Sequence, residues 1–479
     1  MFRTKKDANS VVVRFKARLV AKGCSQVEGV DFGETFAPVA KFNTIRIILA
    51  IAAAMGLEIH QMDVKTAFLN GELDVVIYME QPEGFVQKGR EHLVCKLRKS
   101  LYGLKQSGRA WYECIHIFFV NKGFTRSHAD HSLYVLQTCH YIVIVIIYVD
   151  DLIILASNVD VINELKASLE SEFEMSDLGE LHFFLGVHFE RDRKTRTITM
   201  HQRSYIETIL ERFGMADCKP IATPLDAKTS LVKLSEEEYE EHSHEMKDIP
   251  YQEAVGSLMY AMVATRPDLA FAVSVVSRFM SKPGPMHWMA VKRIMRYLKG
   301  TIDVRLRIGG QHMNVKGYSD ADWAGDVENR RSTSGYVFFV GDGAVSWNSK
   351  RQQTVAQSTM EAEYMAMNRC TREAIWLRQL MEDVGCAQEE ATTMMCDNQG
   401  SMALAKNPTN HDRSKHIDVQ HHFIREKIEN KVVELEYCPT QYMVADILTK
   451  ALARDRHEML SEIMGLEYNA TSQSGSIGR

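Results

Sequence analysis

Tyr148-Val149-Asp150-Asp151 joins two apolar runs, 141–147 and 152–156, and this arrangement predicts a β-hairpin whose tip carries two carboxylates. Both runs are rich in isoleucine and valine and are bounded by polar residues, as buried strands are. Neighbouring residues of a strand point to opposite faces, so one site can use both acids only if the turn brings them around. Asp is also a favoured turn residue, and the tetrapeptide alone more often marks an ordinary turn.

Upstream motifs decide between these interpretations. Residues 61–71 place an acid, Asp63, five residues before an aromatic, Phe68, and end in an Asn-Gly turn. Residues 101–112, with Leu-Tyr-Gly-Leu-Lys-Gln followed by Ala-Trp-Tyr, form a small, basic and aromatic stretch suited to contact with a template. Together with the motifs at 16–23 and 34–39, they closely resemble the reverse transcriptase of copia-type LTR retrotransposons. The match continues almost unbroken to the C-terminal region.

The resemblance implies that Asp63, Asp150 and Asp151 are the metal-binding triad of a polymerase palm. Asp63 and Asp150 would hold two Mg²⁺ ions most directly, with Mn²⁺ as a substitute. Two such ions can hold the attacking and leaving oxygens of a phosphoryl transfer. Phe68 would be an aromatic gate that clashes with a ribose 2′-OH. The alternative for Phe68 is an ordinary core residue, and periodicity does not separate the two.

The same resemblance assigns contacts to nucleotide and template. Lys16, Arg18 and Lys22 would be fingers residues that meet the incoming triphosphate, although a solvated basic edge strand has the same composition. The residues expected to contact template or primer are Tyr102, Gly103, Lys105, Gln106 and Tyr148.

A second set of acids follows residue 313, where strands, a helix, a strand and a late helix at 444–450 resemble the RNase H fold. Asp320, Glu361, Asp397 and Asp446 are its expected catalytic and metal-binding residues, because carboxylates from four elements can grip a scissile phosphate through two metal ions. Asp322 shares a strand face with Asp320, and Glu363 is two residues from Glu361, so each is either a neighbour or a ligand. Asp397 alone, before Asn-Gln, is typical of a helix cap.

The expected fold class is a multidomain combination of α+β and α/β structure: a right-hand polymerase with fingers, palm and thumb, a helical connection and an RNase H-like mixed sheet. The expected boundaries are 1–225 for the polymerase, 226–249 for an acidic linker or exposed loop, 250–312 for the connection, 313–465 for the RNase H-like domain and 466–479 for a disordered tail. Asp160 is expected to cap a helix. Helix 286–298 is expected to bury Met289 and to offer Lys292, Arg293 and Arg296 to phosphates.

Charge and composition indicate in which cellular compartment the protein is expected. The formal net charge of −5 is unusual for a protein that binds nucleic acid, but the acids concentrate at 236–241, while basic residues gather at 3–22 and 96–109. Nine cysteines without a Cys-x-x-Cys pair, no secretory signal and no apolar run near the roughly 20 residues of a membrane helix favour an intracellular protein. We expect a cytoplasmic location, in a virus-like particle, or a nuclear one, without secretion or membrane binding.

The leading hypothesis is an RNA-directed DNA polymerase with ribonuclease H activity, whose partners are an RNA template, a DNA primer, the RNA–DNA hybrid and dNTPs. Its oligomeric state is open. The chain is expected to begin inside the fingers, and Ser107-Gly108-Arg109 departs from the family's Ala-Pro-Arg. A remnant that binds nucleic acid without polymerising is therefore an alternative, and a non-catalytic structural or partner-binding protein is a weaker one. His411 and His416 belong to a histidine cluster whose spacing fits no familiar zinc site.

Overall fold

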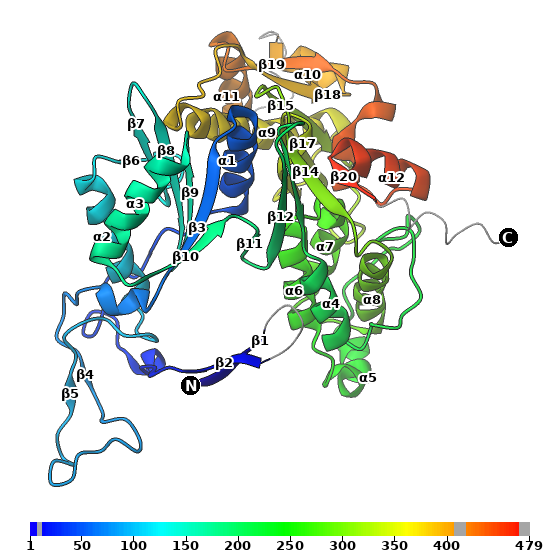
Figure 1. Cartoon of the computed structure of the whole chain (residues 1–479). Helices are drawn as coiled ribbons and strands as arrows, with labels where there is room; N and C mark the ends of the chain where they lie inside the picture. Colours follow the sequence, from blue (N-terminus) through cyan, green and yellow to red (C-terminus); the bar gives the residue numbers. More distant parts are fainter. Residues whose placement is uncertain (7–11, 407–417, 469–479) are drawn as a thin grey trace. The chain divides into compact units, whose positions relative to one another are not determined.

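The computed structural model describes residues 1–6, 12–406 and 418–468. The chain divides into two compact units, each of which combines helices with sheets (Figure 1). This agrees with the expected mixture of α and β structure. Unit 1 comprises Met1–Lys41, Leu57–Leu181 and Asp383–Gly385, and unit 2 comprises Phe42–Gly56, His182–Glu382 and Cys386–Arg479.

A six-stranded antiparallel sheet organises unit 1, in the order β10-β3-β9-β8-β7-β6. The predicted hairpin is confirmed as β8 and β9, which lie in the middle of this sheet. The strands are β3 (Glu58–Val64), β6 (Thr125–Arg126), β7 (Leu133–Gln137), β8 (Ile142–Tyr148), β9 (Asp151–Ala156) and β10 (Met175–Glu180).

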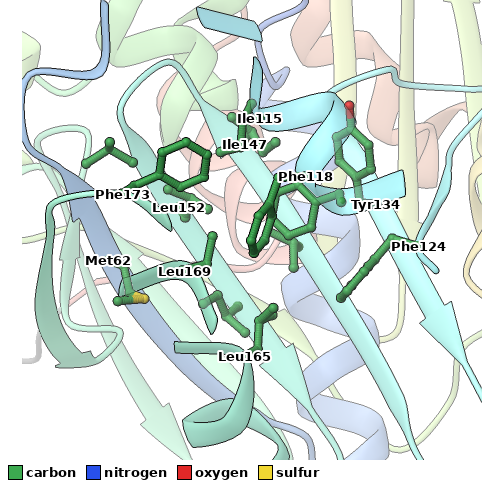
Figure 2. Close-up of a cluster of buried hydrophobic side chains, with 14 of the residues drawn as sticks. Met62, Ile115, Phe118, Phe124, Tyr134, Ile147, Leu152, Leu165, Leu169 and Phe173 are labelled. Carbon is green, nitrogen blue, oxygen red and sulfur yellow. The ribbon is translucent and has the colours of Figure 1, made fainter. Parts of the chain in front are cut away.

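Helices α2 (Ser107–Asn121) and α3 (Val159–Glu172) cover one face of the sheet. Figure 2 shows the apolar core that α2 and α3 form with the sheet, in which Phe118 and Leu169 lie in one cluster with strand residues such as Leu152. Burying such side chains contributes about 1.5–3 kcal/mol each, so this core fixes the sheet that carries the hairpin tip. The expected cap of α3 was wrong: Asn158, not Asp160, accepts the hydrogen bond from the backbone N–H of Val161.

Smaller elements complete unit 1. Two antiparallel pairs form separate two-stranded sheets, and two short 3₁₀ helices lie in the connecting segments. These elements are β1 (Phe2–Lys6) with β2 (Val12–Ala17), β4 (Tyr78–Met79) with β5 (Cys95–Lys96), η1 (Gly23–Ser25) and η2 (Ala67–Asn70).

Unit 2 contains two five-stranded sheets. The first is antiparallel, in the order β11-β12-β13-β14-β20. The second, in the order β17-β16-β15-β18-β19, joins three antiparallel strands to two that run parallel to β15. The strands are β11 (Phe183–Phe184), β12 (Val187–Asp192), β13 (Thr197–His201), β14 (Arg305–Gly309), β15 (Val315–Ala321), β16 (Thr333–Val340), β17 (Gly343–Arg351), β18 (Thr392–Cys396), β19 (Val433–Tyr437) and β20 (Leu466–Glu467).

Helices of unit 2 pack around these sheets, and the expected helical block at 251–300 is confirmed by three helices that share one apolar core with α4. The α-helices are α1 (Phe42–Met55), α4 (Arg203–Arg212), α6 (Tyr251–Ala264), α7 (Ala270–Ser277), α8 (Pro285–Gly300), α9 (Thr359–Asp383), α10 (Gln399–Lys406), α11 (Asp418–Glu429) and α12 (Arg454–Ile463). The 3₁₀ helices include η3 (Pro267–Leu269), η5 (Thr440–Tyr442) and η6 (Val444–Leu448).

Four local expectations need correction. Part of the acidic segment is not a loop but helix α5 (Glu236–Met246), because Ser235 and Glu238 form a capping box at its start. Met289 is 66% exposed rather than buried. Arg293 and Arg296, which were expected to be available to phosphates, donate hydrogen bonds within the chain, to Thr223 Oγ1 and to the Lys219 carbonyl. The late helix at 444–450 is the short η6.

No helix within the described ranges combines the length and the apolar character that crossing a membrane requires.

Candidate functional sites

The hairpin tip of unit 1 brings its acids to one end of the sheet. Asp63 on β3 lies directly opposite Asp151 on β9. Opposed residues of antiparallel strands present their side chains on the same face, about 4.5–5.5 Å apart at Cβ. Asp150 occupies the turn, and its carbonyl accepts a 2.7 Å hydrogen bond from the Val64 N–H. The strand register therefore brings Asp63, Asp150 and Asp151 to the same end of the sheet.

The turn itself has an unusual backbone. Val149 has φ +59°, a conformation that a β-branched residue adopts only under constraint. Trp111, which is 1% exposed, donates a 2.6 Å hydrogen bond from Nε1 to the Val149 carbonyl. Tyr148 pairs with Asp151 across the turn. Thus Trp111, from the Ala-Trp-Tyr motif of α2, holds the tip, a contact that the sequence motifs alone did not assign.

An aromatic and basic stack links two further motifs of unit 1. The rings of Phe68 and Tyr102 lie 5.5 Å apart, and the Arg18 guanidinium lies 5.3 Å from the centre of the Tyr102 ring. Phe68 is half-buried, and it packs both against the Tyr102 ring and against the apolar core of unit 1. The structure therefore joins a residue expected at the triphosphate to the expected gate, through Tyr102.

The segment around Gly103 approaches the segment around Ala21 closely. The Ala21 N–H donates a 2.8 Å hydrogen bond to the Tyr102 carbonyl. Gly103 has φ +101°, and a Cβ there would lie 2.2 Å from the Ala21 carbonyl oxygen. A Cβ at Gly23 would likewise lie 2.0 Å from the Gly103 carbonyl oxygen. Only glycine fits at these two positions.

Gln26 also joins these motifs, although no sequence pattern pointed to it. Its side chain donates to Gln106 Oε1 at 3.0 Å and accepts from the Lys105 N–H at 2.7 Å. The remaining basic candidates lie nearby along the chain: Lys16 pairs with Arg3 in the β1–β2 ladder, and the exposed Lys22 precedes η1.

Unit 2 contains a tighter acidic cluster. Ligand oxygens of Asp320, Glu363 and Asp397 all lie within 4.8 Å of one another. Asp320 is the second-last residue of β15, Glu363 lies on α9 and Asp397 follows β18. Burial, together with the charge of Asp397, raises the pKa values of Asp320 and Glu363. The raised pKa values mean that the ionised carboxylates are unfavourable at this site, and a bound cation would offset their negative charge.

Glu361 and Asp322, the two other acids of these motifs, have different partners. The Glu361 carboxylate accepts a 2.8 Å hydrogen bond from the Gln357 N–H just before α9. Asp322 accepts a hydrogen bond from the Thr333 N–H, and burial raises its pKa to about 6. Asn398, not Asp397, caps α10 by accepting from the Ser401 N–H at 2.9 Å. The choice between Glu361 and Glu363 required the orientation of α9, which the sequence pattern did not provide.

Asp446, the fourth expected acid, is 1% exposed and binds cations of its own chain. Lys450 Nζ lies 2.7 Å from Asp446 Oδ1 and 3.8 Å from Asp320 Oδ2. Arg456 forms an ion pair with Asp446 Oδ2, and the Thr449 hydroxyl donates to Asp320 Oδ2. Lys450 and Arg456 were not among the residues expected from the sequence, although the i,i+4 spacing of Asp446 and Lys450 is a signal of an ion pair. His411 and His416 lie outside the described residues.

Known proteins resemble this chain over different lengths. The model of the family described as reverse transcriptase (RNA-dependent DNA polymerase) matches residues 1–227. The retrovirus-related Pol polyprotein from transposon TNT 1-94 of Nicotiana tabacum is 45% identical over 98% of this chain and 35% of its own length. The putative transposon Ty5-1 protein of Saccharomyces cerevisiae is 33% identical over 65% of this chain and 100% of its own length.

A solved structure of a foamy viral protease-reverse transcriptase in complex with RNA/DNA hybrid has 11% identity and a TM-score of 0.44, covering 80% of this chain and 44% of that chain. The chain spans about a third of the length of the Pol polyproteins that it matches almost throughout. By its sequence relatives, the chain belongs to the retrovirus-related Pol polyproteins of copia-type LTR retrotransposons and contains their reverse transcriptase region.

Proposed function

We propose that this chain is an RNA-directed DNA polymerase with ribonuclease H activity. The observation that carries the proposal is the strand register that sets Asp63 opposite Asp151, with Asp150 in the adjoining turn. Two motifs far apart in the sequence thereby supply carboxylates to one end of the sheet. Carboxylate oxygens are the ligands that Mg²⁺ prefers.

In the proposed polymerase, unit 1 supplies the fingers and palm. Asp63, Asp150 and Asp151 would hold divalent ions, which when bound neutralise charge on the phosphoryl oxygens. Arg18, held against Tyr102, would meet the triphosphate, and Phe68, whose ring also lies against Tyr102, would face the sugar of the nucleotide. Lys16 and Lys22 would extend the positive surface. Tyr102, Gly103, Lys105, Gln106 and Tyr148 would position template and primer.

In the proposed nuclease, Asp320, Glu363 and Asp397 would hold a divalent ion. Their three oxygens within 4.8 Å fit a small hard cation. We assign Glu363 to this set in place of Glu361, because the Glu361 carboxylate binds the Gln357 N–H. Asp446 supports the set through Lys450 and Thr449. The substrate would be the RNA strand of an RNA–DNA hybrid.

Two assays on the purified full chain test the proposal. Primer extension on an RNA template with Mg²⁺ should incorporate dNTPs, and Asp150→Asn should abolish incorporation. Cleavage of RNA in a labelled RNA–DNA hybrid should survive Asp150→Asn and be abolished by Asp397→Asn. Absence of incorporation by the unmutated chain, with intact cleavage, would favour the non-polymerising alternative. Absence of both activities would refute the proposal.

A further inference from the structure

A threonine outside the acidic cluster of unit 2 contacts one of its members. The Thr440 hydroxyl donates a 2.9 Å hydrogen bond to Asp397 Oδ2. An ionised carboxylate can accept about four hydrogen bonds, so this bond uses one position and leaves Asp397 able to face Asp320 and Glu363. The two residues are 43 positions apart in the chain, and no sequence motif pointed to Thr440.

The backbone that carries Thr440 is fixed to β18. Thr440 is the first residue of η5, which lies between two buried side chains, Cys438 and Met443. Both belong to a small core that they share with Met395 of β18. The Cys438 N–H also donates a 2.9 Å hydrogen bond to the Cys396 carbonyl at the end of this strand. The acid that follows β18 and the hydroxyl that binds it therefore lie on one packed support.

Helix α12 holds η5 from a second direction. Arg456 donates a 2.6 Å hydrogen bond to the Thr440 carbonyl, and the same guanidinium forms an ion pair with Asp446. Threonine is branched at Cβ and has few χ1 rotamers, so a fixed backbone also restricts where its hydroxyl lies. The position of the Thr440 hydroxyl is thus set by three elements, β18, η5 and α12.

We propose that Thr440 is a positioning residue of the nuclease site, which orients the Asp397 carboxylate for metal binding. Hydrogen-bonded partners of metal ligands fix the orientation of the ligand, and their removal typically lowers metal affinity or activity about 10–100-fold. Thr440 is exposed, so water partly replaces its hydroxyl, and we expect a loss of about 10-fold. This inference rests on the proposed nuclease function and adds to it a residue without a carboxylate.

Calorimetric titration of the full chain with Mn²⁺ tests the proposal. The parent carries Asp63→Asn, Asp150→Asn and Asp151→Asn, so that the polymerase acids contribute no binding. Thr440→Val keeps the shape of the side chain but removes the hydroxyl, and it should raise the dissociation constant for Mn²⁺ about 10-fold. Thr440→Ser keeps a hydroxyl and should bind Mn²⁺ nearly as tightly as the parent.

Thr393→Val is the matched control. The Thr393 hydroxyl, on β18, donates a 2.7 Å hydrogen bond to Glu434 Oε1 on β19. The control therefore removes the same kind of bond from the same sheet but leaves the acidic cluster intact. Its dissociation constant for Mn²⁺ should equal that of the parent. The unfolding midpoints of Thr440→Val and Thr393→Val should fall by similar amounts, which separates metal binding from stability.

Cleavage of RNA in a labelled hybrid, with the polymerase acids unmutated, gives a second readout. Thr440→Val should need about 10-fold more Mg²⁺ for half-maximal cleavage, with an unchanged KM for the hybrid at saturating Mg²⁺.

Unchanged Mn²⁺ affinity in Thr440→Val, or an equal loss in Thr393→Val, would overturn the positioning role. A raised KM for the hybrid with unchanged Mn²⁺ affinity would instead make Thr440 a direct contact of the substrate. No Mn²⁺ binding by the parent, combined with no cleavage by the unmutated chain, would overturn the proposed nuclease and the role of Thr440 with it.

Discussion

Trp111 holds Val149 by a 2.6 Å hydrogen bond from the indole Nε1 to the backbone carbonyl. Val149 has φ +59°, and a residue held in such a region typically costs about 1–3 kcal/mol. The indole is almost fully buried on α2, so it ties the strained turn to the apolar core. This bond connects the packing of unit 1 to the position of Asp150.

Trp111→Phe should loosen the turn. The substitution keeps an aromatic ring but leaves the Val149 carbonyl without its indole partner, which should cost about 1–3 kcal/mol. We expect a lower unfolding midpoint and a loss of dNTP incorporation larger than the fraction of unfolded protein explains. Circular dichroism and primer extension, measured on the same preparation, check this expectation.

Tyr112→Phe is the matched control for this experiment. Tyr112 is the next residue of α2, and its hydroxyl donates a 2.8 Å hydrogen bond to the His131 carbonyl, not to the hairpin tip. It should lower stability to a similar degree and leave incorporation by the folded fraction unchanged. Equal losses of incorporation in both variants would show that Trp111 acts only through general stability.

The sequence was sufficient for elements with a strong local signal. The apolar runs around Asp150 and the hydrophobic spacing at 251–300 depend on local patterns, and both elements formed as expected. The pairing of Asp63 with Asp151 could be inferred only through the family resemblance, because it joins strands far apart in the chain. Contacts such as Gln26 with Gln106 depend on tertiary packing and had no local signal.

Substitutions of Glu361 and Glu363 should differ in their effect on cleavage of the hybrid. Glu363→Gln removes a carboxylate from the cluster with Asp320 and Asp397 and should abolish hybrid cleavage. Glu361→Gln should retain most cleavage, since the amide oxygen still accepts from the Gln357 N–H, with a stability loss of up to about 1 kcal/mol. Rates of cleavage of a labelled hybrid provide the measurement. Loss of cleavage in Glu361→Gln with normal folding would contradict our assignment.

The residues that cap two helices were predicted one or two positions away from the residues that do so in the structure. Asn158 and Asn398 cap α3 and α10, where the sequence drew attention to Asp160 and Asp397. Asn and Asp are nearly equivalent as caps, so the residue at the cap depends on where the helix starts. The choice between Glu361 and Glu363 depended instead on how α9 is rotated about its axis, because residues two apart on a helix lie on different faces.

Asp268 should make the stability of unit 2 sensitive to acid. It is buried and accepts two hydrogen bonds from Arg266, at 2.7 and 3.0 Å, and one from the Tyr297 hydroxyl at 2.7 Å. Burial alone would raise the pKa of Asp268, but Arg266 holds it below its ordinary value. Stability from this carboxylate is therefore complete above the unfolded pKa of about 3.9 and is lost as pH falls below it.

Asp268→Asn should lower stability by about 3–5 kcal/mol near neutral pH, because it leaves the buried Arg266 charge unpaired. The loss should shrink as the pH falls below about 4, where the unmutated chain loses the same ion pair. Unfolding midpoints between neutral and acid pH check this prediction. The exposed Asp248→Asn is the control and should change little. A loss of stability that is constant across this range would show that the charge of Asp268 is unimportant.

Gly103→Ala should disrupt the contact between the 16–23 and 101–106 motifs. The residue has φ +101°, and the added Cβ would lie 2.2 Å from the Ala21 carbonyl oxygen, a backbone atom that cannot rotate away. The Ala21–Tyr102 hydrogen bond would lengthen, and Tyr102 would shift from Arg18 and Phe68. We expect a raised KM for dNTPs in primer extension, in addition to a lower unfolding midpoint.

Gly29→Ala separates backbone strain from this collision. Gly29 has φ +79°, so alanine is strained there too, but nothing lies within 4 Å of the added Cβ. Its cost should be limited to the strain of roughly 1–2 kcal/mol, with an unchanged KM for dNTPs. The difference in KM between the two variants then measures the contribution of the Ala21–Tyr102 contact to nucleotide binding. If both variants have the same KM as the unmutated chain, the stack of Arg18, Tyr102 and Phe68 does not position the nucleotide.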